Sequence, residues 1–113
     1  MNTKDYLPLT ETSFLIILSL VIEAKHGYAI LKEVELLSDR RVKMATGTLY
    51  SALRRMLEEG WIEQVEDADS GQTNRIRKFY RLTKLGHRIF EAESIRLRKL
   101  SEMAKQHQLK QPQ

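Results

Sequence analysis

The chain has 113 residues, of which 42% are hydrophobic and 30% charged, with 19 basic against 15 acidic side chains and a formal net charge of +4. This length predicts one small domain, too small to enclose a large catalytic cleft unless subunits share one. The absence of cysteine excludes disulfides, thiolate nucleophiles and cysteine-based zinc sites. The three histidines are scattered, so we expect no metal site and no cofactor. The most apolar run, residues 14–22, covers about half of a membrane span, so we expect a soluble cytoplasmic protein.

Two helices are predicted in the first third of the chain. Thr10 is a suitable N-cap for the first helix, which continues through an apolar run that is expected to be buried on nearly every side. Gly27 is predicted as the residue that ends this helix. A second helix is predicted over about residues 28–38, because its apolar side chains recur on one face.

The third predicted helix begins near Thr46 and ends before Gly60. Its apolar residues follow the spacing of a fully amphipathic helix. The other face carries hydroxyl and guanidinium groups and no acidic residue before Glu58. Hydroxyls and backbone N–H groups at its start can bind phosphate oxygens. Arg54 and Arg55, one turn further on, can bind a guanine edge or a phosphate.

A β-hairpin and a long helix are predicted in the second half of the chain. Residues 61–66 and 75–82 have the composition of strands, and the segment between them is dense in turn formers. Thr83 is the expected cap of a final helix that runs to about residue 106. Its apolar side chains exceed what one small core can bury, which indicates an interface with a second copy of the chain. The residues expected at this interface are Leu85, Ile89, Phe90, Leu97, Leu100 and Met103.

Charged residues are segregated along the chain. Residues 40–57 hold five basic and no acidic side chains, residues 58–74 hold six acidic and no basic ones, and residues 75–90 hold six basic and no acidic ones. The two basic blocks can build a positive surface on a nearly neutral chain, or they can be neutralised by the acidic block on adjacent strands. The charges alone leave both interpretations open.

The order of the predicted elements is that of a winged helix-turn-helix. The expected fold class is mainly α with a two-stranded β-hairpin (α+β), with a DNA-binding domain over residues 1–83 and a dimerisation helix over residues 84–113. In this architecture the third helix enters the major groove of double-stranded DNA, and the hairpin lies beside it. The residues expected to contact DNA are Thr46, Gly47, Thr48, Tyr50, Ser51, Arg54, Arg55, Arg75, Arg77 and Lys78.

Several sequence blocks, in this order, resemble those of PadR-type transcriptional regulators. They are HGYAI at residues 26–30, GTLYSALRRM at 47–56, EGWIE at 59–63 and RKFYRLTKLG at 77–86. The resemblance covers roughly residues 9–104. It implies a homodimeric winged-helix repressor of the short branch, which binds an inverted repeat and dimerises through its last helix. Many members release DNA on binding a small molecule, so an effector is an expected partner.

Two positions depart from the family pattern. Position 51 is Ser where many relatives carry Pro, which can alter a contact with the DNA backbone. Multidrug-responsive members of the short branch stack planar ligands on tryptophan in the last helix. Here the only tryptophan is Trp61, and the last helix offers just Phe90, which argues against a pore for planar drugs between subunits.

Catalytic function finds no support in the sequence. It contains no glycine-rich phosphate loop, no nucleophile elbow and no metal-binding helix motif, so we expect no enzyme activity. The alternative to a DNA-binding regulator is a winged-helix module that binds other proteins, because fold alone does not fix function. The two hypotheses differ in salt dependence, since neutralising phosphates makes DNA affinity fall steeply as salt rises.

Overall fold

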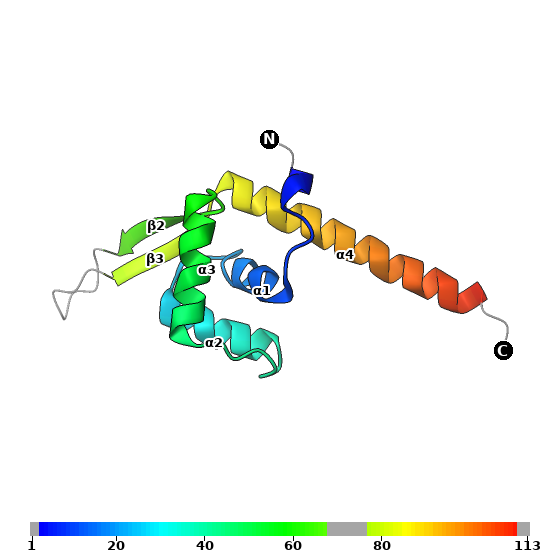
Figure 1. Ribbon diagram of the computed structural model, residues 1–113, viewed down its shortest axis with the longest axis horizontal. Coiled ribbons are helices and arrows are strands. Elements are labelled where there is room, and N and C mark those ends of the chain that lie inside the picture. The colour runs from blue at the N-terminus through cyan, green and yellow to red at the C-terminus, as the bar shows by residue number, and fades with distance from the viewer. Residues whose placement is uncertain (1–2, 68–76, 111–113) are drawn as a thin grey trace.

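The computed structural model describes residues 3–67 and 77–110. It is a mostly helical protein with a small antiparallel sheet and a long C-terminal helix, the architecture of a winged helix (Figure 1). A short 3-10 helix at Thr3–Tyr6 precedes the main elements. In chain order these are α1 (Glu11–Ser19), β1 (Lys25–His26), α2 (Gly27–Leu37), α3 (Thr46–Glu58), β2 (Ile62–Asp67), β3 (Arg77–Leu82) and α4 (Lys84–Lys110).

The sheet has three strands in the order β1-β3-β2, one more than the predicted hairpin. Both neighbours of β3 are antiparallel to it, with Ile62 opposite Leu82 on one side and His26 opposite Phe79 on the other. The prediction of a two-stranded hairpin was therefore incomplete. β1 has only two residues, which is too short for an alternating pattern to signal a strand.

Gly27 begins α2 and does not end α1, so its predicted role was wrong. α1 ends earlier, at Ser19, with Leu20 as its C-cap. The N-cap of α2 is His26, whose Nδ1 accepts a hydrogen bond of 3.2 Å from the backbone N–H of Ala29. A histidine in this role satisfies one of the free N–H groups at a helix start, as the more usual small polar caps do.

Other predicted helix ends are confirmed. Thr10 caps α1 by accepting a 3.1 Å hydrogen bond from the Ser13 N–H. Thr83 caps α4 in the same way, through the Gly86 N–H at 3.1 Å. Gly60 follows α3 with a φ of +80°, a left-handed conformation that glycine adopts without strain. Each cap lies where the periodic pattern of apolar residues starts or stops.

The core lies where α1 meets α2 and α4, with α3 and the sheet closing it from the side (Figure 1). α1 is buried on most sides, as its apolar run predicts, but Ile22 at the end of that run lies beyond α1 and is 93% exposed, because the helix has already ended at Ser19. α3 buries only one face, and the residues of that face are 0–1% exposed: Leu49, Leu53 and Met56. Burial of each such side chain contributes about 1.5–3 kcal/mol. The opposite face of α3 is thereby fixed toward solvent.

α4 belongs to the core only in its first part. Ile89 and Glu93 are 0% and 1% exposed, whereas every residue from Leu97 to Lys110 is exposed. The helix extends beyond the predicted end near residue 106, and its free half projects away from the hairpin (Figure 1). Within the described residues, no helix combines the length and the apolar character needed to cross a membrane.

Candidate nucleic-acid interface

The exposed face of α3 carries the hydroxyl and cationic side chains expected to contact DNA. Thr46, Gly47, Thr48, Tyr50, Ser51, Arg54 and Arg55 are all exposed. The N-cap of α3 is Ala45, which has no side chain that can accept a hydrogen bond from the first turn. The N–H groups of this turn therefore face the exterior without the side-chain cap that α1 and α2 have. Such a helix start is suited to bind an anionic oxygen.

The two arginines of α3 are not neutralised within the described part of the chain. No ion pair joins Arg54 or Arg55 to any carboxylate whose side chain the structure describes. Both side chains are exposed, and they are adjacent in the third turn of the helix. Their positive charge is therefore available to an external anion.

The acidic block neutralises only part of the hairpin. Glu63 and Arg81 face each other across β2 and β3 and form an ion pair with 2.6 Å between Oε1 and Nε. Glu66 and Lys78 are also cross-strand neighbours, but no ion pair of up to 4 Å joins them. Lys78 is exposed. Among the side chains that the structure describes, neutralisation within the sheet thus applies to Arg81 and not to Lys78.

Two of the predicted DNA contacts cannot be placed. Arg75 lies outside the described residues, as does most of the predicted turn of the hairpin. Arg77 is the first residue of β3, but the position of its side chain is not described. Among the predicted residues of the hairpin, Lys78 alone has a described side chain.

A shallow pocket brings the start of α2 together with α3 and β3. It has a volume of about 370 Å³ and is lined by His26, Gly27, Tyr28, Tyr50, Lys78 and Tyr80. Tyr50 and Lys78, predicted separately from α3 and the hairpin, therefore lie at one site. Tyr28 was not predicted to contact DNA, although its side chain is 63% exposed and Lys32 lies 5.5 Å above its ring. The HGYAI block at residues 26–30, which contains Tyr28, is the sequence feature that could have indicated this residue.

The loop between α2 and α3 holds one basic residue that is engaged elsewhere. Arg41 donates to Glu11 at the start of α1, with 2.6 Å between Nη1 and Oε1. This hydrogen bond lowers the pKa of the Glu11 carboxyl and raises the pKa of Arg41. Arg41 therefore ties the loop to α1, which leaves the exposed face of α3 to the other basic residues.

The residues predicted for a dimer interface fall into two groups. Leu97, Leu100 and Met103 are 40%, 44% and 58% exposed on α4. Leu85 and Phe90 are half-buried against the core of their own chain, where Phe90 stacks on Phe14 with 5.7 Å between ring centres. Ile89 is fully buried in the same core, so its side chain has no surface left for a second chain. The prediction for Ile89 was therefore wrong. The buried Ile89 and the exposed Leu97 and Leu100 follow the same helical spacing of apolar residues, so the spacing alone does not distinguish the core from an interface.

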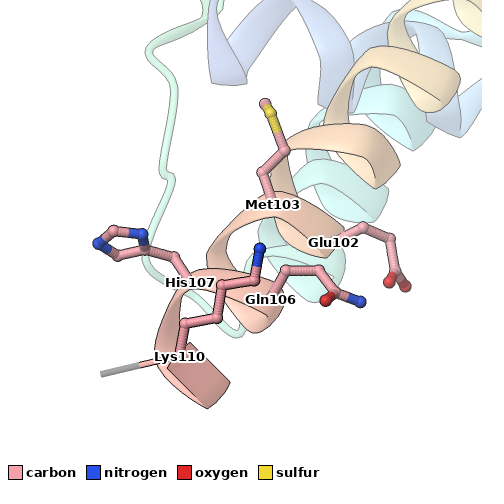
Figure 2. Close-up of a pocket in the computed structure, with 5 residues that line it drawn as sticks. All are labelled: Glu102, Met103, Gln106, His107 and Lys110. Carbon is pink, nitrogen blue, oxygen red and sulfur yellow. The ribbon is translucent and has the colours of Figure 1, made fainter. Parts of the chain in front are cut away.

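The free end of α4 has no tertiary neighbour in the described structure. A hollow of about 320 Å³ at this end is lined only by residues of α4. Figure 2 shows that their side chains all project from this one helix: Glu102, Met103, Gln106, His107 and Lys110. In the described part of the chain, no cluster of histidine and carboxylate side chains could hold a metal ion.

Comparison with known proteins identifies the family. The sequence model of the transcriptional regulator PadR-like family matches residues 17–92, which include α2, α3, both strands of the hairpin and the first nine residues of α4. The chain belongs to the PadR-like family. Curated protein sequences give no match.

Solved PadR-type structures share the fold. A PadR family regulator from Clostridium difficile is 26% identical with a TM-score of 0.72, over 87% of this chain and 98% of its own. A PadR-like regulator from Bacillus cereus is 23% identical with a TM-score of 0.71, over 96% of both chains. PadR of Bacillus subtilis, whose structure contains operator DNA, is 20% identical with a TM-score of 0.63, over 75% of this chain and 47% of its own.

Proposed function

We propose that this PadR-like protein is a homodimeric transcriptional repressor that binds an inverted-repeat operator in DNA. In each subunit α3 lies in a major groove, with Arg54 and Arg55 against base edges or phosphates and Lys78 of the hairpin on the adjacent backbone. The observation that carries this proposal is the exposed face of α3, whose cations have no carboxylate partner among the described residues. The operator complex of the Bacillus subtilis relative supports the same use of the fold.

The proposed dimer forms through the free half of α4. Leu97, Leu100 and Met103 continue the face that Ile89 and Glu93 bury nearer the core. Positions three and four apart lie on one side of a helix, so these side chains form a single apolar stripe. A stripe of this kind on a helix that projects from its own core is suited to pack against the same helix of a second chain.

The proposed dimer fixes the distance between its two copies of α3. A dimer held by a pair of long helices presents two copies of α3, which fit half-sites about one turn of DNA apart. A small-molecule effector releases the operator by binding more tightly to a dimer with a different spacing. Such a ligand shifts the dimers toward that spacing by a factor set by the ratio of its affinities for the two states. Repression follows when the occupied operator overlaps a promoter.

Selection of bound duplexes from a random pool tests this function. We expect enrichment of a symmetric sequence whose half-sites are about 10 base pairs apart. Affinity for the enriched duplex should fall by about 0.9 log units per log unit of salt for each phosphate neutralised. A pool that stays unenriched, together with binding that does not respond to salt, would reject the proposal and favour a module that binds proteins.

A further inference from the structure

A groove between the N-terminal segment and α4 lies apart from the proposed DNA face. It has a volume of about 520 Å³, within the range of ~300–1,000 Å³ that is usual for small-molecule pockets. Leu7 and Pro8 form the wall on one side, and Ala92 and Ile95 of α4 form the other. None of the predicted DNA contacts with a described side chain lines this groove.

The charged residues of the groove are both cations. Arg96 and Lys99 line it, and no carboxylate of the described residues does. Ala92, Ile95 and Lys99 are three and four residues apart, so they share one side of α4. The groove therefore combines apolar side chains with two cationic groups, of which Arg96 is paired with Glu93, and it complements a molecule with an apolar body and one acidic group.

Arg96 is held in a fixed orientation by a buried carboxylate. Glu93 is 1% exposed, and its two oxygens accept from Nε and Nη2 of Arg96 at 2.5 and 2.9 Å. Its Oε2 also accepts from the Leu9 N–H at 2.8 Å, which ties the N-terminal segment to α4. A guanidinium has five N–H groups, so the two bonds to Glu93 leave three for a second anion. This preorganisation lowers the entropy cost when an anion binds.

Lys99 supplies the second cation and has no competing partner in the described structure. Its side chain is exposed, and no ion pair links it to a carboxylate of the described residues. It follows Arg96 by three residues, a spacing that places both cations on adjacent turns of one side of α4. An anionic group at the mouth of the groove can therefore contact both.

The groove is separate from the start of the proposed dimer stripe. Leu97 of the stripe is two residues from Ile95 and two from Lys99, which places it about 160° around the helix from each. A second copy that packs on Leu97 therefore approaches α4 from a different side. Met103, at the other end of the stripe, follows Lys99 by four residues and shares its side of α4, so the groove and the stripe lie on different sides of the helix only at Leu97.

We propose that this groove binds a small organic anion. Its apolar body lies between Leu7 and Pro8 of the N-terminal segment and Ile95, and its acidic group lies between Arg96 and Lys99. The binding site itself is independent of DNA, whereas its use as the effector site rests on the proposed function. Occupancy would be transmitted to the start of α1, because Arg96 also holds the carboxylate that binds Leu9.

A pair of matched fluorescent probes tests the proposal on the full chain without DNA. The anion 8-anilino-1-naphthalenesulfonate and the neutral N-phenyl-1-naphthylamine differ only in the sulfonate group. We expect one molecule of the anion per chain, bound about tenfold more tightly than the neutral probe, because the sulfonate adds a charge-assisted contact with the two cations. Lys99→Gln should weaken the anion about tenfold and leave the neutral probe unchanged. Lys105→Gln removes the same charge from another side of α4 and should change neither.

A second variant separates the groove from nonspecific adsorption. Ile95→Gln removes an apolar wall and should weaken both probes by a similar factor. The proposal is overturned if the two probes bind equally, or if Lys99→Gln and Lys105→Gln have the same effect on the anion. It is also overturned if the wild type binds neither probe, and loss of self-association in Ile95→Gln would then show that a second copy occupies the groove. None of these outcomes bears on DNA binding, so this site and the proposed function fail separately.

Discussion

The ring of Tyr50 on α3 lies directly against Gly27, the first residue of α2. A Cβ on Gly27 would overlap the Tyr50 hydroxyl oxygen and would come within 2.9 Å of Cζ. Real Cβ atoms do not approach other atoms so closely, so the missing side chain of Gly27 makes room for the ring. The contact joins the exposed face of α3 to the start of α2 at the pocket that also contains Lys78.

Gly27→Ala should therefore disturb the DNA face without unfolding the protein. The atoms that a Cβ would meet belong to the outer end of a tyrosine side chain, which can swing away. We expect affinity for the selected duplex to fall by about three- to tenfold, as removal of one hydrogen bond implies. Fluorescence anisotropy measures this change. In a Tyr50→Ala background the same substitution should have no further effect, because coupled residues are not additive. Additive effects would show that Gly27 does not position Tyr50.

Gly86 at the start of α4 should be far less tolerant. A Cβ there would overlap the backbone oxygen of Trp61 and lie 3.1 Å from its carbonyl carbon. Backbone atoms cannot rotate away, so Gly86→Ala should lower the free energy of unfolding by about 1–3 kcal/mol, as overpacking does. Urea denaturation measures the change. Gly47→Ala is the matched control, because a Cβ at Gly47 meets nothing within 4 Å, and it should be neutral or stabilising by up to about 1 kcal/mol. Equal destabilisation by both would refute this account.

Glu93 should make stability depend on acidic pH. The hydrogen bond from Arg96 outweighs the effect of burial and, with help from the Leu9 N–H, lowers the pKa of Glu93 from 4.5. A carboxyl whose pKa is lower in the folded state stabilises the fold above its unfolded pKa, and this contribution disappears as pH falls through the folded value. Glu93→Gln should lower the free energy of unfolding at pH 7 by about 1.5–3 kcal/mol, the contribution of a charged hydrogen bond.

The pH profile distinguishes this charge effect from simple packing. Below pH 4.5 the difference between wild type and Glu93→Gln should shrink, because the wild-type carboxyl gains a proton as pH falls further. Glu11→Gln is the control, since the Glu11–Arg41 pair is exposed at the surface, where such pairs contribute little. A difference that stays constant from about pH 7 to about pH 3 would assign the destabilisation to altered packing around residue 93.

The sequence predicted the elements whose apolar pattern is long, and missed those that depend on distant partners. α3 begins and ends as predicted, because its amphipathic pattern covers three turns. Gly27 was misassigned because the reason for glycine is Tyr50, a residue 23 positions away. Glu93 resembled any polar helix residue, although it accepts a hydrogen bond from Leu9, 84 positions earlier. Periodicity reports local structure, whereas these roles arise from tertiary contacts.

The candidate nucleic-acid interface shows the same difference between features that follow from local pattern and features that depend on tertiary contacts. That Thr48, Arg54 and Arg55 share an exposed face follows from helical geometry, and the structure places them there. The charge pattern left open whether the acidic block neutralises the basic strand. The register of β2 and β3 answers this for one described pair, by placing Glu63 against Arg81 within hydrogen-bond distance. Register depends on pairing across the hairpin, which composition does not encode.

The arginines of α3 should carry much of the electrostatic affinity for DNA. We expect Arg54→Ala with Arg55→Ala to weaken duplex binding by at least about tenfold. The slope of log affinity against log salt should become shallower by about 0.9 for each phosphate that the two side chains no longer neutralise. The melting temperature should change little, because both side chains are exposed. Arg98→Ala removes an exposed arginine of α4 and should leave the slope unchanged. A double variant that binds like the wild type would place the DNA interface on another surface.

The apolar stripe of α4 should hold the two subunits together. Leu100→Glu places a charge among Leu97 and Met103, and a charge without a partner is costly to bury in an interface. Sedimentation velocity at micromolar concentration should show a dimer for the wild type and a monomer for this variant. Leu109→Glu is the matched control. Leu109 is 78% exposed and, nine residues further on, lies about 180° around the helix from Leu100. It should therefore leave the dimer intact. If both variants remain dimeric, the subunits meet on another face. The proposed spacing of the two α3 helices would then be wrong as well, because it depends on dimerisation through the stripe.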